Sequence, residues 1–105
     1  MATTVNVDRD LSEVFQTGSR IIGASAVQLF PGDAYPVAKG AQLKADADNM
    51  GTIYIGVKGV TAGTVAATDG FPLDASEGLH IPIDDLSRIY AIASTADQKL
   101  FFALL

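Results

Sequence analysis

The feature that most constrains the fold of this 105-residue chain is the alternation of side chains in its last third, residues 51–105. In the first run of this region, Ile53, Ile55 and Val57 fall on one face, opposite polar or aromatic side chains. A period of two is typical of a half-buried β-strand. We therefore expect a strand that turns one face, including Val57, toward a core.

Two more strands are expected at the end of the chain, over Arg88–Ser94 and Gln98–Leu105. Both faces of the Arg88–Ser94 strand are largely apolar, which indicates a strand that lies between two layers or under a partner. The short stretch Thr95–Asp97 has the length of a tight turn, and Asp is a good turn residue. We expect the two strands to pair as a hairpin.

Weaker strand patterns precede and interleave with these runs. Ile21–Phe30 alternates loosely, with Gly23 marking a bulge or a close backbone approach. Ala41–Asp48 is apolar at every second position, and Gly78–Ile83 contains Pro82, which favours an edge strand. With about six strands and no strand–helix–strand rhythm, the sequence predicts an all-β, single-domain antiparallel β-sandwich or barrel.

Two segments fall outside the strand pattern. Within residues 1–18, the stretch Asp10–Thr17 has an Asp-x-x-Glu spacing and apolar residues at helical intervals, which predicts a short helix. The alternative is an irregular arm whose Phe15 docks on a neighbouring subunit. The connection Lys58–Ser76 is long enough to be a binding loop. We therefore assign residues 1–18 to an arm or short helix and residues 19–105 to the β-sandwich domain.

The balance of charges narrows the class of partner. The net charge is −5, and the seven Lys and Arg residues are scattered without a basic stripe. We therefore expect neither a nucleic-acid partner nor a membrane partner. Only 18% of the residues are charged, which is low for a small monomer and predicts that part of the surface is covered by a partner.

Few residues suggest catalysis or metal binding. Asp46–Gly51 has the first acids and the Gly of a calcium loop, but Val57 stands where the bidentate Glu is needed. His80 is the only histidine, and the chain has no Cys. Asp84 and Asp85 are adjacent and would point to opposite faces of an extended chain. We predict no catalytic residues, no metal and no cofactor, and expect that the chain is not an enzyme.

The C-terminal half contains, in this order, Ile-Tyr-Ile-Gly (53–56), Val-Thr-Ala-Gly (60–63), Gly-Phe-Pro-Leu (70–73), a Glu-Gly turn (77–78) and Asp-Leu-Ser-Arg-Ile-Tyr-Ala-Ile-Ala-Ser (85–94). This order of motifs resembles that of small virion proteins of tailed bacteriophages, of the capsid decoration (cement) kind. The resemblance implies a β-sandwich or jelly-roll-like domain that binds the major capsid protein or other virion proteins.

An acidic subunit is better placed on the outer surface of a shell than against packaged genome. We therefore expect a decoration subunit on the outside of a phage head, self-associated as a homotrimer. The arm and the Lys58–Ser76 connection are the expected contacts, through Val14, Phe15, Phe71 and Leu73.

Two alternatives remain at this stage. One is an accessory structural protein of the neck or tail. The other is a carbohydrate- or ligand-binding module, since β-sandwiches often carry binding loops. Its stacking platform would be formed by Tyr35, Tyr54, Tyr90 and Phe71, although the core is the more ordinary place for Tyr54 and Tyr90.

Overall fold

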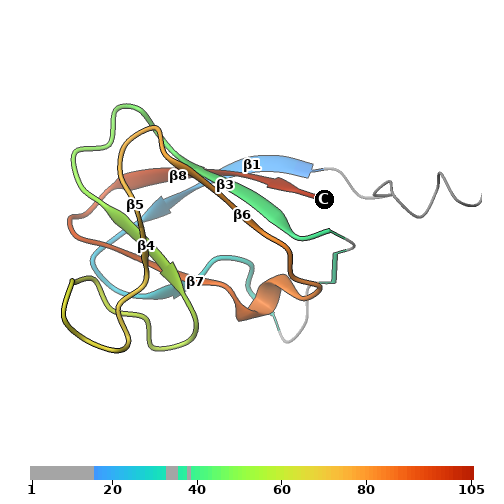
Figure 1. Cartoon of the computed structure of the whole chain (residues 1–105). Coiled ribbons are helices and arrows are strands. Elements are labelled where there is room, and N and C mark those ends of the chain that lie inside the picture. Colours follow the sequence, from blue (N-terminus) through green and yellow to red (C-terminus); the bar gives the residue numbers. More distant parts are fainter. Residues whose placement is uncertain (1–15, 33–35, 38) are drawn as a thin grey trace, which may run out of the picture.

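The structure, a computed structural model, describes residues 16–32, 36, 37 and 39–105, and its eight strands form two four-stranded antiparallel sheets packed together (Figure 1). This confirms the predicted all-β sandwich. The order in sheet A is β1 (Gln16–Ile22), β8 (Gln98–Leu104), β3 (Ala41–Ala45) and β6 (Gly78–Ile81). The order in sheet B is β2 (Val27–Gln28), β7 (Tyr90–Ala93), β4 (Ile53–Gly56) and β5 (Phe71–Leu73).

The strand order has a simple origin. Antiparallel pairs join β1 to β8, β2 to β7, β3 to β6 and β4 to β5, as in one long hairpin whose tip is the β4–β5 connection. Rolling up that hairpin adds the pairs β3–β8 and β4–β7 and gives the two sheets. This is the topology of an eight-stranded jelly roll. The sheets stay separate in the described residues, so the fold is a two-sheet sandwich and not a closed barrel.

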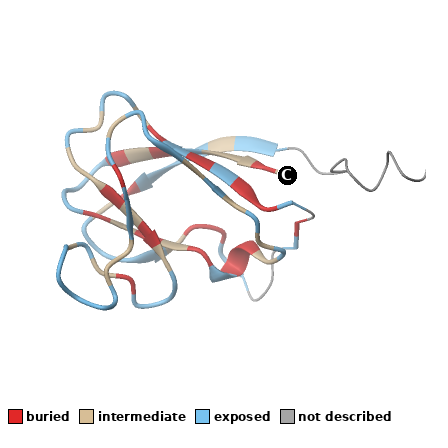
Figure 2. Ribbon diagram, viewed as in Figure 1, coloured by how far each residue is buried: buried red, intermediate tan, exposed pale blue. Residues whose placement is uncertain are grey.

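Buried residues of both sheets form the core between them, and Figure 2 shows them interspersed with exposed residues along the strands. In β3, Ala41, Leu43 and Ala45 are buried while the residues between them are exposed, as their pattern predicts. The edge-to-face contact of Phe30 with Phe102, with ring centroids 5.1 Å apart, adds an aromatic pair to this layer.

The predicted hairpin between the last two strands is wrong. β7 belongs to sheet B and β8 to sheet A, so residues 94–97 cross from one sheet to the other. Asp97 makes this change of direction with a φ of 63°. The cause is burial on both sides of the crossing: Ala91 and Ala93 face the core from sheet B, and Leu100 and Leu104 face it from sheet A.

The expected strand over residues 21–30 is also divided between the sheets. β1 ends at Ile22 and β2 begins at Val27, and the Gly23 carbonyl accepts a hydrogen bond from the Ala93 amide at 2.8 Å. Gly23 thus marks a corner. Because β1 already begins at Gln16, the helix expected over Asp10–Thr17 does not include its last two residues, and the boundary expected at residue 18 lies inside a strand. Residues 10–15 lie outside the described residues.

Other elements differ from the expectation in detail. β6 lies at the edge of sheet A, as predicted, but it ends at Ile81, before Pro82, and does not extend to Ile83. β4 ends at Gly56, so Val57 is 70% exposed and does not face the core. The connection over residues 58–76 contains an unexpected edge strand, β5. The 3₁₀ turn η1 (Leu86–Arg88) is capped by Asp85, whose carboxylate accepts a hydrogen bond from the Ser87 amide.

Candidate partner-binding surfaces

On the outward side of sheet A, side chains of neighbouring strands stand in rows and form a continuous surface, which we call the sheet A face. In the register of the sheet, Ser19, Phe101 and Lys44 stand opposite one another across β1, β8 and β3. The next row contains Thr17, Ala103 and Gln42. The full set of outward side chains is Thr17, Ser19, Ile21, Gln42, Lys44, His80, Lys99, Phe101 and Ala103.

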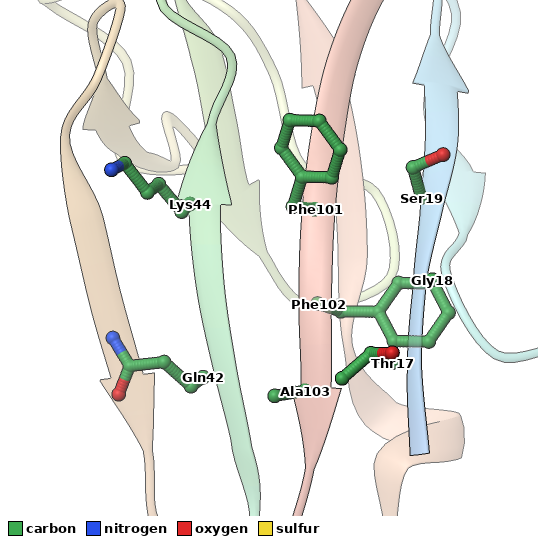
Figure 3. Close-up of a pocket in the computed structure, with 8 residues that line it drawn as sticks. All are labelled: Thr17, Gly18, Ser19, Gln42, Lys44, Phe101, Phe102 and Ala103. Carbon is green, nitrogen blue, oxygen red and sulfur yellow. The ribbon is translucent and has the colours of Figure 1, made fainter.

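A shallow hollow of about 480 Å³ lies in this face around Phe101 (Figure 3). The strand residues beside the phenyl ring are small, and the side chains of Lys44 and Gln42 extend from β3 toward β6, away from it. Phe102 turns the other way, beneath Gly18, where an added Cβ would come within 2.7 Å of the ring. Phe101, on a central strand, therefore remains 42% exposed.

The charges on the sheet A face are all of one sign. None of the eight strands contains an Asp or Glu, so every acidic side chain of the described residues lies in a loop or turn. The outward charged groups of sheet A are Lys44 and Lys99, and the Lys99 ammonium lies 5.6 Å from the centroid of the Phe101 ring. A cation at this distance from a ring face is a favourable contact. The face is therefore basic and apolar in a chain whose net charge is −5.

A second surface is formed by the β4–β5 loop, residues 57–70. The Asp69 carboxylate organises it, accepting hydrogen bonds from the Thr61 hydroxyl at 2.6 Å and the Ala66 amide at 2.7 Å. These bonds, that of Thr61 first, hold the pKa of Asp69 below its ordinary value because they stabilise the charged form. The hydroxyl groups of Thr61 and Thr68 are also hydrogen-bonded to each other, at 2.9 Å. The long connection therefore has a defined internal structure.

The β4–β5 loop and the strand that follows it present three apolar side chains to solvent. Val65, at the tip, is 97% exposed, and Val57 and Phe71 at the base are 70% and 57% exposed. Of the predicted contact residues, Phe71 is thus available. Leu73 is not, because it pairs with Ile53 on the inner side of sheet B and is 1% exposed. Val14 and Phe15 lie outside the described residues.

Sequence reasoning missed Phe101, Ile21 and Val65. The alternation in residues 98–104 contained a signal for Phe101, because a strand that buries Leu100 and Leu104 turns Phe101 outward. The adjacent Phe102 concealed that signal, since both phenylalanines look equally suited to a core.

The predicted aromatic platform is only partly assembled. Tyr54 and Tyr90 are partly buried on the outward side of sheet B, where Tyr54 stands opposite Ile92 and Tyr90 stands opposite Gly56. Both tyrosines therefore share one outer surface and do not lie in the core. Phe71 pairs with Ile55, on the other side of that sheet, and Tyr35 lies outside the described residues.

The residues considered for catalysis or metal binding have structural roles or lie apart. Asp85 caps η1 through Ser87, and His80 is exposed on edge strand β6. The Asn49 side chain of the acidic loop donates to the Lys99 carbonyl and accepts from the Lys99 amide, both at 2.8 Å. Among the described residues, no three His, Cys, Asp or Glu side chains are grouped so that they could hold a metal ion.

Comparison with protein-family models, with curated proteins and with solved structures found no match. In the part of the chain that the structure describes, no helix is long and apolar enough to cross a membrane. The function is therefore inferred from the surfaces themselves.

Proposed function

We propose that this chain is a virion structural protein, a decoration (cement) subunit that binds the outer face of a bacteriophage head and stabilises it. The observation that carries the proposal is the set of exposed apolar side chains on the ordered β4–β5 loop and at the start of β5: Val57, Val65 and Phe71. The jelly-roll topology agrees with it, because this architecture is common in viral capsid proteins. The sequence resemblance of residues 51–105 points the same way.

The loop suits attachment to a preformed protein lattice. Its hydrogen bonds to Asp69 fix the backbone before binding, which reduces the conformational entropy lost on contact. Burying one such apolar side chain contributes about 1.5–3 kcal/mol. An oligomer that presents several copies of the loop to a repeating lattice would multiply this contribution through avidity. The negative net charge favours the outer surface of the head over the surface that faces the genome.

The test is binding of the recombinant protein to heads of the encoding phage that were assembled without it. Cosedimentation should show saturable binding, and electron microscopy should show added density on the outer surface. The variant Val65→Asp combined with Phe71→Asp should lose binding at least tenfold, because a buried carboxylate opposes an apolar contact.

Met50→Asp is the matched control, since Met50 is 95% exposed but lies in a different loop, after β3. It should bind like the unchanged protein. Failure of the unchanged protein to bind these heads would overturn the proposal, and binding at the neck or tail would favour the accessory structural role instead.

A carbohydrate-binding function is the second candidate, favoured by Tyr54 and Tyr90 on one outer surface of sheet B. Jelly rolls also occur in lectins, and aromatic rings can stack on sugars. Screening the protein on a glycan array would test it, with Tyr54→Ala and Tyr90→Ala as variants. Glycan binding that disappears in both variants would support this function over head decoration.

A further inference from the structure

The sheet A face requires an occupant with apolar and acidic groups. Its centre is the exposed ring of Phe101 in a hollow of about 480 Å³, and Ile21 beside it is 58% exposed. Its charged groups are Lys44 and Lys99, with no carboxylate in the surrounding strands. The same face of a second copy is a poor occupant, because a two-fold contact would bring lysines against lysines.

The N-terminal segment, residues 1–15, has the complementary composition. It contains three carboxylates against one guanidinium, and several apolar side chains lie among them. The carboxylates are Asp8, Asp10 and Glu13, and the apolar residues nearest to β1 are Leu11, Val14 and Phe15. The segment is joined to Gln16 at the start of β1, the strand that supplies Thr17, Gly18 and Ser19 to the hollow.

Chain geometry indicates which copy would receive the segment. Gln16 stands opposite Leu104, whereas Ser19 stands opposite Phe101, about 10 Å further along β1 at the rise of a strand. To place Leu11, Val14 and Phe15 over its own hollow, the segment would have to reverse within residues 11–17. Residues 11–17 contain no Gly, Pro, Asn or Asp, the residues that favour tight reversals.

We propose that residues 1–15 of one copy bind the sheet A face of a neighbouring copy, with apolar side chains over Phe101 and carboxylates near Lys44 and Lys99. Each copy then gives one segment and receives one. Such a contact is heterologous, and it closes when the copies form a ring. A ring of three would account for the trimer expected from the sequence. The inference concerns self-association and stands independently of head binding.

Charge-reversal variants of the full chain test the proposal. Molar mass is measured by light scattering across a dilution series for the unchanged protein and three variants. The first variant carries Lys44→Glu and Lys99→Glu, the second carries Asp8→Lys and Asp10→Lys, and the third carries all four changes. Each two-site variant should dissociate at a concentration about tenfold or more above that of the unchanged protein, because attraction becomes repulsion. The four-site variant should recover most of the association.

A second measurement examines the apolar contact. Phe101→Ser should weaken association about tenfold or more, whereas Val65→Ser, on the β4–β5 loop, should leave it unchanged. A synthetic peptide of residues 1–15 should dissociate the unchanged oligomer in a dose-dependent manner.

Three results would overturn the proposal. They are a 10.9 kDa monomer at every concentration, charge-reversed variants that assemble like the unchanged protein, and a four-site variant no better associated than either two-site variant. Because Val65→Ser separates the two surfaces, its loss of head binding with intact assembly would agree with both proposals, whereas an unchanged protein that assembles but does not bind heads would count against the proposed function and not against this inference.

Discussion

The sheet A face and the β4–β5 loop both expose apolar side chains, but they hold them in place by different means. Phe101 stands on β8, which is paired on both sides, by β1 and by β3. Val65 stands at the tip of a loop whose shape depends on the hydrogen bonds of Asp69. The position of Phe101 is thus determined by sheet register, whereas the position of Val65 is determined by a few polar contacts.

This difference indicates how each surface can be altered. A residue on the outer side of a central strand can be changed without loss of the core, because its side chain lies on the far side of the sheet from the buried residues. A change at the base of the loop affects both the loop and the strands that support it. Stability measurements therefore distinguish the two surfaces.

The largest expected effect comes from the neighbouring residues Leu100 and Phe101 on β8. Leu100→Ala should lower the free energy of unfolding by about 2–5 kcal/mol, because the buried side chain leaves a cavity. At a concentration at which the protein is monomeric, Phe101→Ala should lower it by less than about 1 kcal/mol, as is usual for a surface position. Urea denaturation measures both. Equal losses would show that the register of β8 is not the one described.

The next largest loss of stability is expected from a substitution at the base of the β4–β5 loop. In Gly70→Ala the new Cβ would lie 2.7 Å from the Val60 side chain and 2.8 Å from the Ile55 carbonyl oxygen. Because the backbone of β4 cannot move aside easily, the free energy of unfolding should fall by about 1–3 kcal/mol, and head binding should weaken with it. Gly23→Ala is the matched control, because nothing lies within 4 Å of its added Cβ. A neutral result for Gly70→Ala would mean that the loop base is loosely packed.

Much of the fold could be predicted from local patterns, whereas the crossings between sheets could not. Alternation in residues 41–45 and 53–56 identified which side chains are buried. It could not assign β7 and β8 to different sheets, because residues 94–97 suit a hairpin turn as well as a crossing. The choice depends on long-range burial. The contact surfaces were harder still, since an exposed Phe101 and a buried Leu73 are both ordinary apolar residues in sequence.

A smaller effect is expected from the carboxylate of Asp69. Its pKa is lowered in the folded protein, so its stabilising effect is present above the ordinary pKa and is lost as the pH falls through the lowered value. Acidification in that range should lower the protection of the Ala66 amide, which donates to Asp69, when its hydrogen-exchange rate is divided by the intrinsic rate at the same pH. Asp69→Asn should show fast exchange already at neutral pH. Asp48→Asn controls for the loss of one charge and should leave Ala66 protected.

The smallest expected effect is that of a chelator, which should leave the thermal midpoint unchanged. The loop over residues 46–51 is held by protein groups, because Asn49 exchanges two hydrogen bonds with the backbone of Lys99, and the Gly51 amide donates to the Gln98 side chain. These bonds connect the loop to β8, at the end of the strand that carries Phe101. Asn49→Ala should therefore lower the free energy of unfolding by about 1–3 kcal/mol, since it leaves the Lys99 amide unpaired and removes one of the two donors to the Lys99 carbonyl. Differential scanning calorimetry with and without chelator compares the two changes. A midpoint that falls on adding chelator to the unchanged protein, and not to a variant lacking Asp46 and Asp48 carboxylates, would identify a metal in this loop.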